Sequence, residues 1–95
     1  MYHLKILTSE EIVLDDEVVA LIAPGTEGYL GVLSDHAPLI TSLKEGTLVI
    51  TDKNNKRSYY HISGGFLEVD HNKASILVEK IAPTEPVDIG TMGGI

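Results

Sequence analysis

Short runs of apolar residues alternate with polar turns along most of the chain, and this rhythm predicts an all-β protein. The runs recur about every eight to twelve residues and are separated by Gly, Asp, Asn and Pro, a spacing typical of a β-sandwich or barrel. No segment keeps a helical period over roughly ten residues, so we expect no long helix. We predict a sandwich of two packed antiparallel sheets, built from about nine or ten short strands.

The predicted strands follow from the alternation and from the turn residues between them. They cover residues 2–8, 11–14, 17–23, 29–33, 38–43, 46–51, 57–62, 66–69 and 73–79. Successive side chains of a strand point to opposite faces, so alternation also predicts which of them form the core. The core candidates are Leu4, Ile6, Val18, Ile22, Leu48, Ile50, Leu67, Val69, Ile76 and Val78.

The character of the chain changes after Ala82. Two prolines and three glycines interrupt residues 83–95, and no amphipathic pattern runs through them. Proline removes backbone donors and glycine raises the cost of ordering. We therefore expect a sandwich domain over residues 1–82 and a loosely held tail over residues 83–95.

Charge argues against a nucleic-acid partner. The chain has 14 acidic and 7 basic residues, a formal net charge of −7. Binding to phosphates needs clustered Lys and Arg. The one such cluster, Lys53, Lys56 and Arg57, surrounds two asparagines and is interpreted as a solvated hairpin turn.

Cysteine content and hydropathy limit the possible chemistry and the location of the protein. The chain has no cysteine, which excludes disulfides, thiolate metal sites and cysteine nucleophiles. The longest apolar run, at residues 18–23, is far too short to span a membrane. Residues 1–5 begin a strand pattern and do not resemble a signal peptide. We expect a soluble protein on the cytoplasmic side, reaching any membrane through a partner.

Glycines and polar side chains offer only weak catalytic signals. Gly25, Gly28 and Gly31 lack the Lys-Ser/Thr and the helix that a phosphate loop requires, so we interpret them as turn or bulge residues. Ser63 could be combined with His61 and Asp70 as a triad, but no nucleophile elbow surrounds it. A turn serine is the favoured interpretation, and a small hydrolase built on Ser63 and His61 is the weaker alternative.

We interpret the histidines and tyrosines as packing or partner-contact residues, not as metal ligands. The four histidines lie on separate predicted strands and turns, which does not match metal-ligand spacing, and we expect no metal. His36 is interpreted as a loop-ordering or interface residue. Tyr29 is expected in a glycine-flanked loop, as a partner contact. Tyr59 and Tyr60 are adjacent and should face opposite sides, one in the core and one exposed.

Four motifs in a fixed order carry a family resemblance. Residues 23–39 read Ala-Pro-Gly-Thr-Glu-Gly-Tyr-Leu-Gly-Val-Leu-Ser-Asp-His-Ala-Pro-Leu, which closely resembles the signature of ATP synthase epsilon subunits. Leu-Lys-Ile-Leu-Thr at residues 4–8 resembles the family's first strand. Thr-Ser-Leu-Lys-Glu-Gly at residues 41–46 and Ser-Gly-Gly-Phe-Leu-Glu-Val at residues 63–69 resemble two further hallmarks. The resemblance covers essentially residues 2–89.

The resemblance implies both a fold and a role. The family's N-terminal domain is a β-sandwich in the central stalk of F-type ATP synthase, bound to the gamma subunit and seated on the ring of c subunits. It is a non-catalytic rotor part that helps to couple ion flow to ATP synthesis, peripheral to the cytoplasmic face of the bacterial membrane or the equivalent organelle membrane. No catalytic residue and no cofactor are implied. The residues expected to contact the c-ring or gamma are Glu27, Gly28, Tyr29, Ser34, Asp35, His36, Ala37 and Pro38.

Three departures from the family pattern qualify this expectation. Tyr29 stands where the family often has an acidic residue, and Ser34-Asp35 stands where it commonly has Pro-Gly. Residues 83–95 are too few for the family's C-terminal helical hairpin, since short helices are marginal. We therefore expect coupling without helix-mediated inhibition and without ATP binding. The alternative from another class is a generic β-sandwich module that binds a protein or a carbohydrate.

Overall fold

The computed structural model describes residues 1–87, which form nine β-strands and contain no helix. All-β architecture and the number of strands are therefore as predicted. The strands are Tyr2–Leu7 (β1), Ile12–Gly25 (β2), Gly28–Leu33 (β3), Leu39–Leu43 (β4), Gly46–Asp52 (β5), Arg57–Ile62 (β6), Gly65–Asp70 (β7), Lys73–Val78 (β8) and Ile81–Pro83 (β9).

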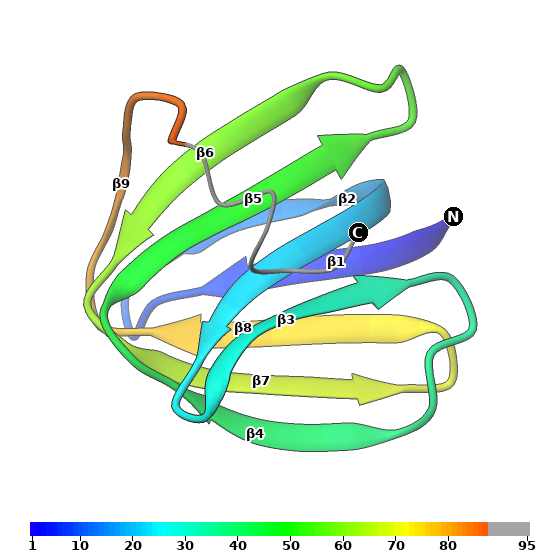
Figure 1. Cartoon of the computed structure of the whole chain (residues 1–95), viewed down its shortest axis with the longest axis horizontal. Coiled ribbons are helices and arrows are strands. Elements are labelled where there is room, and N and C mark those ends of the chain that lie inside the picture. Colours follow the sequence, from blue (N-terminus) through cyan, green and yellow to red (C-terminus); the bar gives the residue numbers. More distant parts are fainter. Residues whose placement is uncertain (88–95) are drawn as a thin grey trace.

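The long strand β2 belongs to both layers of the sandwich (Figure 1). Its first half pairs with β1, which continues the layer through β8, β7 and β4. Its second half pairs with β3 on one side and with β5 on the other, and β6 and β9 follow β5. The register towards β5 shifts between Val18 and Ala20, where the strand passes from one layer to the other.

Two local predictions are wrong. Asp15 and Asp16 do not form a turn between two strands, because both lie inside β2 and pair with Lys5 and Leu4 of β1. Their carboxylates are exposed, and consecutive polar residues inside a strand resemble a turn in sequence. Gly31 lies in unbroken register and makes no bulge.

Two strand relationships were not predicted. β1 and β8 run parallel from His3 opposite Lys73 to Leu7 opposite Leu77, so this layer is not wholly antiparallel. Alternation cannot reveal strand direction, and a parallel pair needs only a long connection, which residues 8–72 provide. β9 pairs with β6 although it has only three residues. The predicted division at residue 82 stays a prediction, and residues 88–95 of the predicted tail lie outside the described residues.

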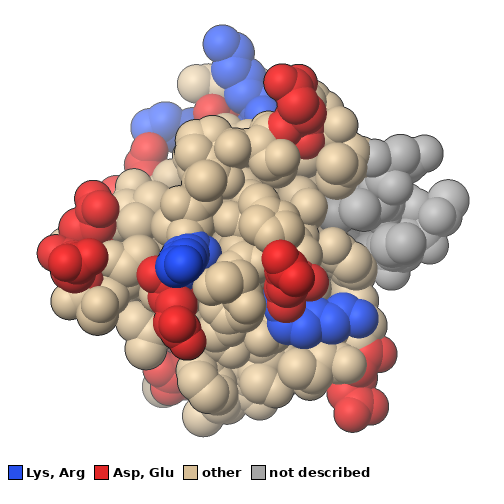
Figure 2. Space-filling model, turned by 90° about the vertical axis from the view of Figure 1, so that its left-hand side faces the viewer, with Lys and Arg blue, Asp and Glu red and all other residues tan. Residues whose placement is uncertain are grey.

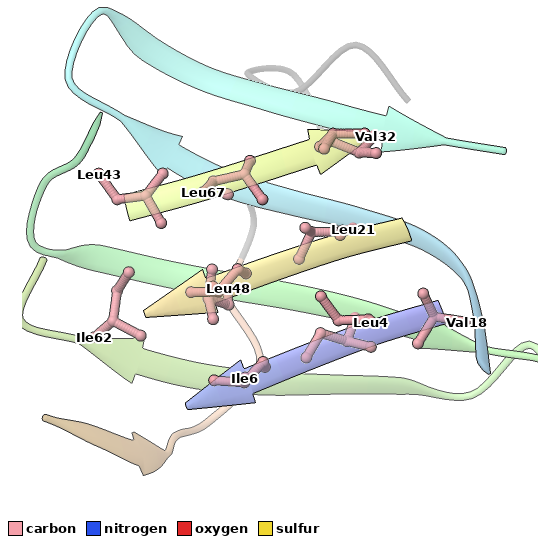
Figure 3. Close-up of a cluster of buried hydrophobic side chains, with 14 of the residues drawn as sticks. Leu4, Ile6, Val18, Leu21, Val32, Leu43, Leu48, Ile62 and Leu67 are labelled. Atoms are coloured by element: carbon pink, nitrogen blue, oxygen red, sulfur yellow. The ribbon is translucent and has the colours of Figure 1, made fainter. Parts of the chain in front are cut away.

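The core lies between the two layers, as Figure 3 shows for side chains that point towards one another from both. All ten predicted core residues are buried, nine of them in this central cluster. Burying an aliphatic side chain of this size stabilises the fold by about 1.5–3 kcal/mol. Residues that alternation alone did not select, but that are also buried there, are Tyr2, Leu21, Ala23, Val32, Leu43, Ile62 and Ala74.

The tenth residue, Ile22, lies outside the central core. It forms a second cluster with Val49, against which Tyr29 and Tyr59 pack. Tyr60 packs on the central core instead, so the two adjacent tyrosines face opposite sides as predicted. Neither is fully exposed, because the ring of Tyr59 takes part in the second cluster.

A buried hydrogen bond joins the two layers. The Tyr2 hydroxyl donates to the Val32 carbonyl oxygen over 2.7 Å, linking β1 to β3. Burial raises the pKa of the Tyr2 phenol well above its ordinary value, since the phenolate would lose its hydration. Tyr2 therefore remains a neutral donor wherever the protein is folded at moderate pH.

Candidate partner-binding surface

The residues predicted to bind a partner lie at the two ends of β3 (Figure 1). Glu27, Gly28 and Tyr29 lie at its start, and residues 34–38 follow its end. Six strand residues span about 20 Å at 3.3 Å each. The structure therefore forms two separate segments from these residues and does not bring them into one patch.

The β2–β3 turn is compact and tied to a neighbouring strand. Thr26 donates its backbone N–H to the Ser42 carbonyl oxygen over 3.2 Å, and their hydroxyl oxygens lie 3.1 Å apart. Gly25 has no room for a side chain, because a Cβ would lie 2.8 Å from the Gly28 carbonyl oxygen. Gly28 has φ +129°, a conformation that favours glycine. The turn therefore holds Glu27 exposed at a fixed tip.

Tyr29 is held more firmly than a loop residue. It lies within β3, is half-buried, and packs on Ile22 and Val49. Its hydroxyl oxygen accepts a hydrogen bond from the backbone N–H of Thr47 over 3.1 Å. Gly46 leaves space for this hydroxyl, since a Cβ there would lie 2.9 Å away. Tyr29 thus has a structural task whether or not a partner touches its ring.

The β3–β4 loop contains the Ser-Asp-His-Ala-Pro motif. Asp35 has φ +61°, in the left-handed region that favours glycine. The Nδ1 atom of His36 lies 2.7 Å from the Ala37 carbonyl oxygen, so the ring donates from Nδ1. His36 is half-buried, whereas Ser34, Asp35, Ala37 and Pro38 are exposed.

Sequence reasoning missed an exposed apolar row on the outer face of the first layer. Phe66 of β7 lies opposite Leu77 of β8, Leu77 lies beside Leu7 of β1, and Leu7 pairs with Ile12 of β2. Phe66 is 60% exposed, Leu77 51% and Ile12 54%, whereas Leu7 between them is half-buried. We call these four residues the apolar row. With strands about 4.8 Å apart, the row extends about 15 Å across the sheet.

The apolar row is continuous with the β2–β3 turn. Phe66 lies opposite Ser42 of β4, and Ser42 in turn holds Thr26 through the bonds described above. The turn and the row therefore form one surface, whereas the β3–β4 loop lies at the other end of β3. A signal for the row exists in the sequence, since adjacent apolar residues such as Phe66-Leu67 must place one side chain on the outside of a strand.

A hollow of about 420 Å³ lies beside the apolar row. Phe66 and Leu77 line it together with Ser63, Gly64 and Gly65. The two glycines have φ +126° and +156°, and a Cβ on Gly65 would lie 2.0 Å from the Leu77 carbonyl oxygen. The Ser-Gly-Gly motif therefore allows a close approach of two backbones and leaves a shallow depression where side chains would otherwise stand.

The structure does not assemble the catalytic triad that Ser63 suggests on paper. The Ser63 hydroxyl oxygen accepts a hydrogen bond from the Lys80 backbone N–H over 3.1 Å. His61 Nε2 lies 3.0 Å from a Glu45 carboxylate oxygen. Asp70 lies at the far end of β7, beside His71. These hydrogen bonds connect turns and strand ends, in agreement with the interpretation of Ser63 as a turn serine.

Charge on the surface is mixed. Figure 2 views the molecule from the left-hand side of Figure 1, where the β2–β3 and β4–β5 turns lie, and shows acidic and basic groups scattered between larger uncharged areas. Within residues 1–87, no group of three or more His, Cys, Asp or Glu side chains is placed to hold a metal ion. Nor does this part of the chain contain a helix long and apolar enough to cross a bilayer.

Fold and surface together define a small β-sandwich whose exposed features suit contacts with other proteins. The chain belongs to the ATP synthase Delta/Epsilon chain family through its β-sandwich domain, since the family model matches residues 1–84. This agrees with the resemblance carried by the four sequence motifs.

Relatives with established names support the same assignment. The chain is 39% identical over 89 residues to the ATP synthase epsilon chain of Protochlamydia amoebophila, and 43% identical over 87 residues to that of Pelotomaculum thermopropionicum. These matches cover 94% and 92% of this chain, but only 60% and 64% of the relatives. The chain thus spans less than two thirds of their length.

Solved structures agree on the fold. A chain in the mitochondrial ATP synthase of Euglena gracilis, in a structure of OSCP, F1 and the c-ring, superposes with a TM-score of 0.82 at 31% identity, over 90% of this chain and 54% of that one. A chain in the central stalk and c-ring structure of Tetrahymena thermophila ATP synthase gives a TM-score of 0.72 over 84% of this chain and 64% of that one. At 20% identity, the second match supports the fold alone.

Proposed function

We propose that this chain is a non-catalytic rotor subunit in the central stalk of an F-type ATP synthase. It links the gamma subunit to the ring of c subunits and helps to couple ion translocation to ATP synthesis. Family membership over residues 1–84 supports this role, and the observation that carries it is the exposed apolar row. The chain works at the cytoplasmic face of a bacterial membrane or the equivalent side of an organelle membrane, attached through its partners.

A linking subunit needs surfaces for two partners. In our proposal Glu27, Gly28 and Tyr29 face the c-ring, and the apolar row faces gamma. The row begins beside the turn but runs away from it across four strands, so two partners can be bound side by side. The loop with Ser34, Asp35, His36, Ala37 and Pro38 is a further contact segment, at the opposite end of β3.

Physical chemistry favours the apolar row as the stronger contact. Interfaces gain most from buried aromatic and large aliphatic side chains near their centre. Phe66 and Leu77 are more than half exposed without a partner, so each has apolar area left to bury. Glu79 lines the adjoining hollow and Glu11 precedes Ile12, and both are exposed. We therefore expect apolar residues flanked by Lys or Arg on the gamma surface that covers the row.

Matched substitutions test the assignment of the row. Leu77→Ser and Leu33→Ser change the same residue type at nearly equal exposure, 51% and 50%, on different layers. We expect Leu77→Ser to weaken binding to purified gamma by roughly tenfold or more, since truncating a central anchor typically costs about 2 kcal/mol or more. Leu33→Ser should leave it nearly unchanged. Equal effects of the two variants would refute the row as the gamma surface.

A second pair tests the c-ring contact. Glu27→Ala removes an exposed side chain at the turn tip, and Glu85→Ala is its control. Glu27 is a cleaner probe than Tyr29, whose removal would also uncover Ile22 and Val49. We expect Glu27→Ala to weaken binding to the isolated ring and leave gamma binding intact. If the unaltered chain binds neither gamma nor the ring, the rotor proposal fails and the generic binding module remains.

A further inference from the structure

The turn between β7 and β8 has an unusual backbone for its residues. His71 and Asn72 both adopt the left-handed conformation, with φ +51° and +58°. A two-residue hairpin turn of this kind matches the twist of the flanking strands, and asparagine tolerates it better than most residues. Turn chemistry alone therefore accounts for an asparagine at position 72, but not for what its side chain does.

The Asn72 side chain makes two hydrogen bonds to distant parts of the chain. Its Oδ1 atom accepts from the Asp35 backbone N–H over 2.7 Å. Its Nδ2 atom donates to the Met1 carbonyl oxygen over 3.1 Å. One bond needs an acceptor and the other a donor, and a primary amide offers both on one planar group. The amide thus joins the β7–β8 turn, the β3–β4 loop and the N-terminus.

The hydrogen bond to Asp35 is made at a residue whose backbone conformation is strained. Asp35 is itself left-handed, at φ +61°, and directly precedes His36. A residue with a Cβ is held in this conformation at an energetic cost, so the loop needs an outside constraint to keep it. The short bond to Asn72 is such a constraint, because it fixes the direction of the Asp35 N–H group.

We propose that Asn72 is the positioning residue of the β3–β4 loop: its side-chain amide clamps Asp35 and Met1 together and so sets the orientation in which His36, Ala37 and Pro38 meet a stalk partner. The functional half of this inference rests on the proposed rotor role. The structural half, that the amide orders the loop, stands without it.

A matched pair of glycine substitutions isolates the amide. Asn72→Gly keeps a residue suited to left-handed φ and deletes the clamp. Asn55→Gly makes the same substitution in the β5–β6 turn. There Asn55 has φ +63°, and its backbone N–H donates a hydrogen bond to the Asp52 carbonyl oxygen within the turn. The melting temperature of Asn55→Gly shows the effect of a glycine in such a turn, and so separates loop ordering from general destabilisation.

Amide exchange measured by NMR on the full 95-residue chain tests the structural half. We expect the Asp35 amide to exchange about fivefold faster or more in Asn72→Gly, with shifted signals from His36 and Ala37, and no such change in Asn55→Gly. Asn72→Asp keeps the acceptor for Asp35 but loses the donor to Met1, so it should preserve most of the Asp35 protection. Unchanged exchange at Asp35 in Asn72→Gly would overturn the clamp.

Affinity for gamma and for the c-ring, measured separately, tests the functional half. Asn72→Gly should weaken one of them by about fivefold, while Asn72→Asp weakens it less and Asn55→Gly not at all. Faster exchange with both affinities unchanged would overturn the role of Asn72 in partner binding. Failure of the unaltered chain to bind either partner would instead refute the rotor proposal, and the exchange data would still decide whether Asn72 orders the loop.

Discussion

The hydrogen bond from Tyr2 to Val32 allows a sharp prediction about stability. Tyr2→Phe preserves the buried ring, since the residue is only 2% exposed, and removes one hydroxyl. The Val32 carbonyl oxygen then loses its partner from the other layer. A neutral hydrogen bond contributes about 0.5–1.5 kcal/mol net, and an unsatisfied buried group costs about 1–3 kcal/mol. We expect the free energy of unfolding to fall by about 1.5 kcal/mol at pH 7.

This change should be visible in thermal unfolding. A domain of about this size loses about 4–8 °C of melting temperature for each 1 kcal/mol, so the shift should be about 6–12 °C. Tyr60→Phe is the matched control, because Tyr60 packs on the same core but is only half-buried. Its melting temperature should change by clearly less than that of Tyr2→Phe.

The pH dependence gives an independent check with a defined sign. Burial raises the pKa of Tyr2 in the folded protein, whereas in the unfolded chain the phenol ionises near its ordinary value of about 10. Above pH 10 the unfolded state therefore binds fewer protons, and stability is lost as pH rises. Between pH 10 and 11 this loss approaches about 1.4 kcal/mol per pH unit, and Tyr2→Phe removes it.

The gap between the wild-type protein and Tyr2→Phe should therefore narrow from about 1.5 kcal/mol at pH 7 to near zero at about pH 11. Urea unfolding at pH 7, 9, 10 and 11 measures it. A gap below about 0.3 kcal/mol at pH 7 would refute the role of the hydrogen bond. A gap that stays constant up to pH 11 would refute the burial of the phenol as the cause of the raised pKa.

Three further substitutions follow from packing and backbone geometry, each measured by chemical unfolding. Gly65→Ala should unfold the protein or cost more than about 3 kcal/mol, because a Cβ would lie 2.0 Å from the Leu77 carbonyl oxygen; a loss below about 1 kcal/mol would contradict this contact. Asp35→Gly should be neutral or slightly stabilising, because glycine reaches φ +61° without strain. Asp35→Ala should cost about 1 kcal/mol, because alanine tolerates this conformation less well than aspartate; the reverse order of the two variants would contradict this reasoning. Leu48→Ala, at a fully buried position, should cost about 2–5 kcal/mol, and a cost within about 0.5 kcal/mol would mean that the site is not part of the core.

Alternation in the sequence was enough to predict the layers and most of the core. Leu4 and Ile6 have Lys5 between them, and Leu67 and Val69 have Glu68 between them; this pattern has only one stable placement against a core. The same logic fails where polar residues enter a strand. Asp15 and Asp16 look like a turn because hydropathy does not distinguish a turn from a strand whose side chains face water.

The candidate surface was predictable in its members but not in its arrangement. The motifs identify Glu27 and His36, yet only the length of β3 shows that these residues lie at opposite ends of one strand. Phe66 and Leu77 are ordinary strand residues in sequence. They become a surface only through the pairing of β7, β8 and β1, which depends on contacts between distant parts of the chain.

The parallel pairing of β1 with β8 has a consequence for how the protein is made. Residues 3–7 leave the ribosome well before residues 73–77, which form one of their two partner strands and lie close to the end of the domain. Pairings this distant in sequence slow folding, because a long loop must close before its contacts stabilise it. Until β8 has been synthesised, one edge of β1 has free backbone groups that can pair with another chain. The interval in which this protein is most prone to aggregation should therefore last until translation of the domain is nearly complete.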